Sequence, residues 1–267
     1  MTSRPTILVF DSGLGGLTVH RQIAAVRPDA RLIYAADDQA FPYGRLTEDA
    51  VSERVVTVLA ALIETYEPDL VVIACNTAST VVLDDLRKRF SVPFVGTVPA
   101  IKPACAASRT RRVSVLGTEA TVAREYTKSL IRDFGQGCAV TLVGAARLAG
   151  YAEAELHGEP ATDDAIVAEI APCFIDDGTR TDTVVLACTH YPLLLPRLEK
   201  LAPWAVTFID PAPAIARRVV DLIGPLRPGW EPAQAQAHFT SGRAPSPHLA
   251  AALAGFGLQP APASQSI

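Results

Sequence analysis

Short, continuous apolar segments alternate with amphipathic segments along most of this chain, and this alternation limits its fold more than any other feature. Eight apolar segments have the length and the Val, Ile and Leu content of buried strands: Thr6–Phe10, Leu32–Ala35, Leu70–Ala74, Phe94–Thr97, Val113–Leu116, Val140–Gly144, Thr183–Ala187 and Val206–Ile209. A strand that is apolar on both faces needs cover on both faces, as in parallel sheets flanked by helices. The sequence therefore predicts an α/β protein with parallel-sheet cores.

The segments between these strands are expected to be helices. The clearest is Thr47–Tyr66, where a threonine can cap the helix, Glu48 and Asp49 occupy the first turn, and apolar residues recur at helical spacing. Further helices are expected over Leu17–Val26, Thr80–Phe90, Thr121–Phe134, Thr162–Ile175 and Ala212–Ile223. We also expect a late edge strand over Ala237–Gly242.

The two halves of the chain resemble each other in three places that follow the same order. Val71–Thr77 resembles Val184–His190, which puts Cys75 and Cys188 at matching positions. The other two matches are Ile7–Gly13 with Val113–Thr118, and Val98–Ile101 with Asp210–Ile215. Their common order predicts two similar α/β lobes related by a pseudo-twofold axis, with the active site in the cleft between them.

The third match also suggests where the chain crosses from one lobe to the other. Its Pro-Ala segments fall near residues 97 and 210. We therefore expect a first lobe formed by residues 1–97 plus 210–267, and a second lobe formed by residues 98–209.

Composition excludes several classes of partner. The 267 residues carry 24 basic and 28 acidic side chains, a net charge of −4, and the basic residues form no stripe, so nucleic acid is not an expected partner. No apolar stretch approaches the roughly 18 residues of a membrane-spanning helix, and the first residues lack the pattern of a signal peptide. These features predict a cytoplasmic protein without a membrane contact.

The five cysteines are Cys75, Cys105, Cys138, Cys173 and Cys188, an odd number at wide spacing that argues against a disulfide framework. A single cysteine after an apolar strand is usually a small buried hydrophobic residue. Cys75 and Cys188 differ because they occupy matching positions and are followed by amide, hydroxyl or imidazole side chains. We interpret the other three as structural.

Two matched thiols suit the chemistry of racemisation. Ligands in open α/β sheets bind beyond the carboxyl ends of the strands, where Cys75, Cys188 and Asp11 are all expected. A racemase removes a proton from one face of a carbon and returns one to the opposite face, so it needs an acid and a base on opposite sides. His190 could tune Cys188, and Asp11 could assist Cys75.

The glycine-rich segment Asp11–Gly16 opens a helix and has two interpretations. Its backbone N–H groups could anchor a substrate carboxylate at the helix N-terminus, or the segment could be a tight turn without function. A dinucleotide-binding motif needs glycine where this chain has Thr18, so that pattern fails. Phe41–Gly44 is a turn signature, and Asp37 and Asp38 before it could cap a loop or line a site.

Three other functions have to be weighed against racemisation. Zinc could be held by Cys75, Cys188, His190 and Asp11, but the close ligand spacing of structural zinc sites is missing. A hydrolase with one cysteine as nucleophile leaves the second cysteine without a role. A binding protein without chemistry fits two lobes and a cleft, but gives no reason for matched cysteines.

Four motifs together resemble the glutamate racemases of the aspartate/glutamate racemase superfamily: Asp11–Leu17, Pro42–Gly44, Ala74–Ala78 and Cys188–Pro192. The resemblance spans nearly the whole chain and implies a two-lobed isomerase that uses neither pyridoxal phosphate nor a metal. It assigns Cys75 to the D-glutamate side and Cys188 to the L-glutamate side, with Asp11 and His190 as helpers.

The same resemblance implies the substrate contacts, which are Asp11, Ser12, Tyr43, Gly44, Asn76, Thr77, Thr118, Thr189 and His190. It further implies that glutamate is the small-molecule substrate, and that the product D-glutamate supplies peptidoglycan synthesis and so cell wall biogenesis and cell shape. Homodimers are common in the family. A relative acting on aspartate or a hydantoin is the alternative within the superfamily.

Two segments depart from the family pattern. The stretch Ala145–Glu153 stands where many members have Cys-Pro followed by Phe-Val-x-Leu-Val-Glu, so either Glu153 or Glu155 matches the family's glutamate. Asp37–Ala40 replaces the usual Asp-Thr-Ala-Arg, and the missing arginine leaves the dimer mode and regulation open.

Overall fold

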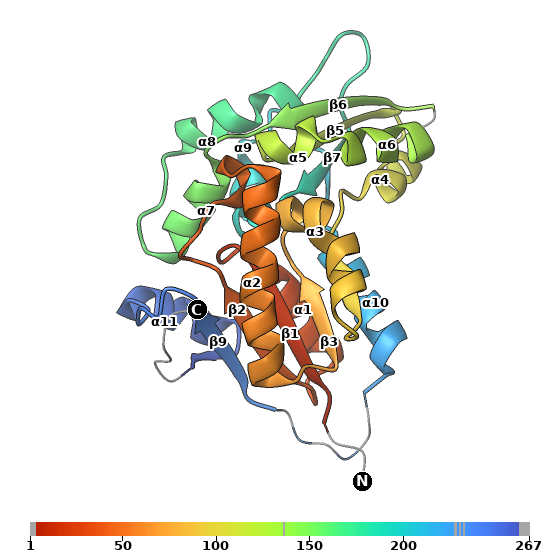
Figure 1. Ribbon diagram of the computed structural model, residues 1–267. Helices are drawn as coiled ribbons and strands as arrows, with labels where there is room; N and C mark the ends of the chain where they lie inside the picture. Colours follow the sequence, from red (N-terminus) through yellow and green to blue (C-terminus); the bar gives the residue numbers. More distant parts are fainter. Residues whose placement is uncertain (1–3, 136, 227–228, 230, 232, 262–267) are drawn as a thin grey trace.

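Two separate parallel sheets organise the part of the chain that the computed structural model describes, residues 4–135, 137–226, 229, 231 and 233–261 (Figure 1). The first sheet has the order β10-β9-β2-β1-β3-β4 and the second the order β6-β5-β7-β8. The first contains β1 (Thr6–Asp11), β2 (Arg31–Ala36), β3 (Leu70–Ile73), β4 (Phe94–Gly96), β9 (Ala235–Phe239) and β10 (Leu258–Pro260). The second contains β5 (Arg112–Gly117), β6 (Ala139–Gly144), β7 (Thr183–Ala187) and β8 (Thr207–Ile209).

The strand order repeats between the two sheets. The order β2-β1-β3-β4 in the first sheet matches β6-β5-β7-β8 in the second, and the strand pairs within each set are parallel. Cys75 follows β3 and Cys188 follows the equivalent β7. The predicted fold class, two similar α/β lobes with parallel cores, is confirmed.

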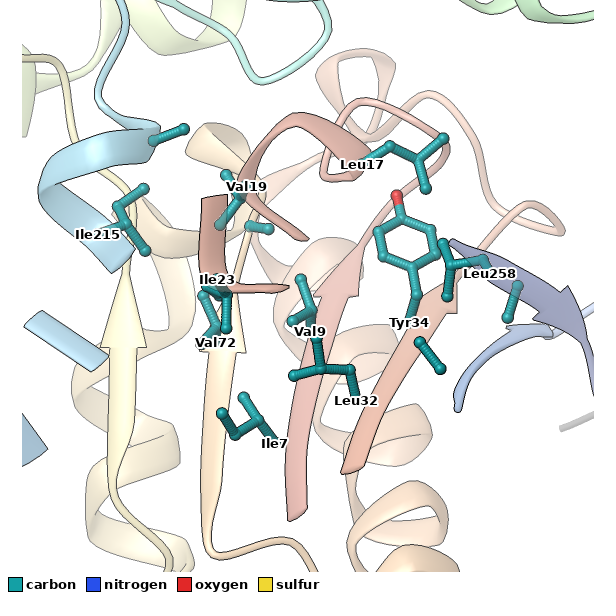
Figure 2. Packing of buried hydrophobic residues seen from close by; sticks show 14 of the residues in the cluster. Ile7, Val9, Leu17, Val19, Ile23, Leu32, Tyr34, Val72, Ile215 and Leu258 are labelled. Atoms are coloured by element: carbon teal, nitrogen blue, oxygen red, sulfur yellow. The ribbon is translucent and has the colours of Figure 1, made fainter. Parts of the chain in front are cut away.

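Both faces of the first sheet are covered, as continuous apolar strands require. Ile7 and Val9 of β1 point to one face, where they pack with α1 (Leu17–Val26) and α10 (Ala212–Ile223), as Figure 2 shows for part of this cluster. Leu8 and Phe10 point to the other face, which is covered by α2 (Glu48–Tyr66) and α3 (Asn76–Arg89). The helix α11 (Pro247–Gly255) adds Leu249 to the first of these clusters.

The second sheet is covered in the same way. One face packs against α4 (Ile101–Ala107) and α6 (Glu125–Phe134), and the other against α7 (Leu148–Leu156), α8 (Asp163–Ile170) and α9 (Leu195–Leu201). Within the described residues, no helix is both long and apolar enough to cross a membrane.

The expected helix over Thr47–Tyr66 forms almost as predicted. Thr47 is the N-cap of α2, and its side chain accepts a hydrogen bond from the backbone N–H of Ala50. The helix ends where Glu67 adopts a left-handed conformation (φ 44°), which stops further helical hydrogen bonds.

Three helix predictions and one strand prediction need correction. The helix α3 begins at Asn76 rather than Thr80, because Cys75 is its N-cap. Arg124 is extended and divides the expected 121–134 helix into α5 (Glu119–Ala123) and α6. The expected 162–175 helix ends at residue 170, where a short 3₁₀ turn (Ala171–Cys173) with a proline follows. The late strand β9 is not an edge strand, since β10 pairs outside it.

Candidate active site

The ends of two strands bring cysteine side chains to one cavity between the lobes, and a third strand ends in Asp11, which is fully buried and does not line this cavity. Asp11 is the last residue of β1, and Cys75 and Cys188 lie just beyond β3 and β7. One cavity of about 20 Å³ is lined by both cysteines and by Ser12, Phe41, Pro42, Tyr43, Gly44, Asn76, Thr77, Thr118, Ala149, Thr189 and His190. This volume holds about one water molecule, so an amino acid can enter only when the lobes or their loops open.

Cys75 is contributed by the first lobe and is almost fully buried, with 5 % of its surface exposed. Its Sγ lies 3.7 Å from the hydroxyl oxygen of Ser12. Burial raises the pKa of the Cys75 thiol well above its ordinary value, and the nearby carboxylate of Asp11 raises it further. Cys75 is therefore protonated and can serve as an acid.

Cys188 is contributed by the second lobe and has a different neighbour. Its Sγ lies 3.9 Å from Nδ1 of His190, whose Nε2 pairs with a carboxylate oxygen of Glu153 at 2.8 Å. Burial lowers the pKa of His190, but the hydrogen bonds with Cys188 and Glu153 and the charges of Asp11 and Glu153 together raise it well above its ordinary value. A protonated His190 would place a positive charge beside the Cys188 sulfur.

Glu153 connects the two lobes. It lies on α7 in the second lobe, and its Oε1 accepts a hydrogen bond of 2.6 Å from the backbone N–H of Leu14, in the glycine-rich turn of the first lobe. Glu155 points elsewhere and forms an ion pair with Arg197 at 2.7 Å. Of the two glutamates that the sequence left open, Glu153 is the one at the site.

The glycine-rich turn is built around protein carboxylates. The Asp11 side chain accepts hydrogen bonds of 2.7 Å from the backbone N–H groups of Ser12 and Gly16. Burial raises the pKa of Asp11, while the charge of His190 and these two hydrogen bonds lower it. The N–H groups of Leu14 and Gly16 are already bonded to protein carboxylates, so they are not available to anchor a substrate carboxylate. The sequence had suggested such an anchor as one of two interpretations of this segment, and these two groups do not support it.

A buried network fixes the Pro42–Gly44 segment. The Tyr43 hydroxyl donates a hydrogen bond of 2.5 Å to Asp37, which does not line the cavity. Asp37 also accepts hydrogen bonds from Arg54 (2.9 Å) and from Thr240 (2.6 Å). The sequence indicated Asp37 only as a loop cap or lining residue; its partners come from a distant helix and from the segment after β9, which no local pattern reveals.

The remaining predicted contacts supply hydrogen-bonding groups to the cavity. Both side-chain polar atoms of Asn76 are buried without a hydrogen-bond partner, an arrangement that needs an explanation and that a bound ligand would satisfy. Thr77 and Thr118, from different lobes, have their hydroxyl oxygens 3.4 Å apart. The carbonyl of Thr189 accepts a hydrogen bond of 3.3 Å from Thr18 of the first lobe.

These groups define a small-molecule site with an acid or base on each side. Two thiols from matching strand ends share one cavity with the unpaired amide of Asn76 and several hydroxyl groups. Among the described residues, no three His, Cys, Asp or Glu side chains are grouped as metal ligands.

Comparison with known proteins agrees with this description. The sequence model of the Asp/Glu/Hydantoin racemase family matches residues 17–219. The glutamate racemase of Brucella anthropi is 57 % identical over 223 residues, which are 83 % of this chain and 80 % of the relative. That of Brucella canis is 52 % identical over 258 residues, 95 % and 92 % of the two chains.

A solved structure extends the likeness to three dimensions. The crystal structure of Escherichia coli glutamate racemase in complex with L-glutamate and the activator UDP-MurNAc-ala has a TM-score of 0.87 and 41 % identity, with 97 % of this chain and 98 % of that chain covered. The chain belongs to the Asp/Glu/Hydantoin racemase family and is an isomerase. Within that family it falls among the glutamate racemases, as its motifs predict.

Proposed function

We propose that this chain interconverts L- and D-glutamate by a 1,1-proton transfer between Cys75 and Cys188, without a cofactor. The observation that carries the proposal is that cysteines from equivalent strand ends of the two lobes line one cavity. The Escherichia coli relative, crystallised with L-glutamate, supports glutamate as the substrate.

In the direction from L- to D-glutamate, Cys188 acts as the base and Cys75 as the acid. A Cys188 thiolate, stabilised by the His190 imidazolium, takes the Cα proton of L-glutamate, and the electron pair of the broken C–H bond is shared with the adjacent carboxylate. Cys75 then gives its thiol proton to the opposite face of the carbon, which forms D-glutamate and leaves a thiolate on Cys75. In the reverse reaction the two thiols exchange roles.

Binding of glutamate is assigned to the polar lining of the cavity. The buried Asn76 amide, which has no protein partner, would bond to a substrate group. The other proposed contacts are Ser12, Tyr43, Gly44, Thr77, Thr118, Thr189, His190 and Asp11. Tyr43 would act through its backbone and ring, since its hydroxyl is bonded to Asp37.

The proposal extends to the role of the enzyme in the cell. D-glutamate would supply peptidoglycan synthesis, and so cell wall biogenesis and cell shape, from a cytoplasmic homodimer that contacts neither nucleic acid nor membrane. The two lobes would comprise residues 1–97 plus 210–267 and residues 98–209.

The test is a circular-dichroism assay on L- and on D-glutamate without added cofactor. It is run with and without UDP-MurNAc-ala, because the relative was crystallised with that activator. Cys75→Ser and Cys188→Ser should each lower the rate by about 10² to 10⁴-fold, the usual contribution of a general acid or base. Cys138→Ser, at a partly buried position outside the cavity, is the matched control.

The alternative substrates are tested in the same series. Exchange of the α-proton in D₂O is measured with glutamate, aspartate and hydantoins. Exchange with aspartate or a hydantoin, and none with glutamate, would contradict the proposed function.

A further inference from the structure

A second, larger cavity lies next to the cavity between the cysteines. It has a volume of about 600 Å³, and it shares five lining residues with the inner cavity: Phe41, Pro42, Gly44, Thr118 and Ala149. Since the inner cavity is too small for an amino acid, this shared wall has to move when a ligand enters. The outer cavity is then the space from which the ligand arrives.

Both lobes form the mouth of this outer cavity. The first lobe contributes Gly44 and Arg45 of the 3₁₀ turn, with Phe41 and Pro42 before it. The second contributes Thr118, Glu119 and the residues at 145–147 and 149–151, around the start of α7. The two lobes are in close contact here, because a Cβ placed on Gly44 would lie 3.5 Å from the Cβ of Thr118. A side chain that extends from the turn is therefore placed at the entry.

Three charged residues line the outer cavity, and only one of them offers a free cation. Arg147 is engaged, because its Nε donates a hydrogen bond of 2.9 Å to Glu169. Glu119 is exposed and anionic. Arg45 is exposed, directly follows Gly44, and its guanidinium has no hydrogen bond or ion pair with any residue that the structure describes.

A free cation at this place has a clear electrostatic effect. Glutamate carries two carboxylates and one ammonium group at neutral pH, and the protein has a net charge of −4, so the overall field repels the substrate. A local positive charge at the mouth opposes this repulsion within about 8 Å, the screening length at physiological ionic strength. We propose that Arg45 captures a substrate carboxylate at the mouth of the outer cavity, an inference that rests on the proposed function.

The experiment compares wild-type enzyme with Arg45→Gln and Arg45→Glu in the glutamate racemisation assay at low and at high salt. At low ionic strength we expect kcat/KM to fall by about threefold for Arg45→Gln and about tenfold for Arg45→Glu, with kcat within about twofold. At about 0.5 M salt the differences should nearly vanish, because the charges are screened. Glu119→Gln should raise kcat/KM at low salt.

The control is Arg89→Glu, a charge reversal at an exposed residue in the last turn of α3, outside both cavities. It should leave kcat/KM close to the wild-type value, which separates capture at the mouth from a change in net charge. Unchanged kcat/KM in both Arg45 variants, or a loss that salt does not relieve, overturns the inference and leaves the proposed function intact. A wild-type enzyme that does not racemise glutamate overturns both.

Discussion

Replacing Glu153 with glutamine tests the connection between the lobes and the acid/base chemistry. Glutamine has the same shape, so its carbonyl oxygen can still accept the hydrogen bond from the Leu14 N–H, which is 2.6 Å in the wild-type protein. What the variant loses is the charged partner of His190, now 2.8 Å from Nε2. The pKa of His190 should therefore fall, and the Cys188 thiolate should lose part of its stabilisation.

The size of the effect follows from the interaction that is lost. A hydrogen bond to a charged group contributes about 1.5 to 3 kcal/mol. Since about 1.4 kcal/mol corresponds to a factor of ten in rate, we expect kcat/KM to fall by about 10- to 150-fold. Glu153→Ala should be slower still, because it also removes the acceptor for Leu14.

The assay is circular dichroism with each enantiomer between about pH 6 and pH 10. The two enantiomers have equal free energy in water, so kcat/KM must fall by the same factor in both directions, whereas kcat and KM can change unequally. The alkaline limb of the kcat/KM profile should move to lower pH, because loss of the carboxylate lowers the pKa of His190.

The matched control is Glu155→Gln, two residues further along α7, where the side chain pairs with Arg197 and does not reach the cavity. It should keep nearly wild-type kinetics. A Glu153→Gln enzyme within twofold of wild type, or one whose alkaline limb stays in place, would refute the role assigned to this carboxylate.

Two further predictions concern the first lobe. A Cβ on Gly15 would collide with the imidazole of the neighbouring lobe, so Gly15→Ala should lower kcat strongly, whereas Gly255→Ala, with no atom within 4 Å, should keep wild-type rates in the same assay. Burial lowers the pKa of His20 to about 4 from its ordinary 6.5, so the unfolded chain binds a proton between these values and the folded protein does not. The free energy of unfolding, measured by urea titration, should therefore be unaffected by His20 above about pH 6.5. It should fall by about 3 kcal/mol as the pH drops to 4. His20→Leu should remove this loss, and an equal loss in both proteins would contradict the assignment.

The sequence predicted the strands and the ends of the strands well. The eight expected strands all form, because runs such as Leu70–Ile73 are apolar on both faces and can only be buried in a covered sheet. The matching positions of Cys75 and Cys188 were visible as well, since a repeated strand carries its last residue to the equivalent place. These features depend on local pattern and on order along the chain.

The sequence did not reveal contacts that depend on how the lobes meet. The helix that carries Glu153 was not predicted, because it is only nine residues long, contains Gly150 and has no side-chain cap at Arg147. The contact of Glu153 with Leu14 joins residues 139 positions apart. Likewise, Arg54 reaches Asp37 only after α2 has packed on the sheet.

The two cysteines have unequal neighbours. Two lobes related by rotation can place their sulfur atoms alike, but the enantiomers of glutamate are mirror images, and no rotation of an all-L polypeptide produces a mirror image. In this protein the neighbours also differ, since one sulfur lies beside the Ser12 hydroxyl and the other beside the His190 ring. An L-configured analogue and its D-enantiomer therefore contact different groups around the two sulfur atoms. Inhibitors designed on L- and D-scaffolds will have to be optimised as separate series.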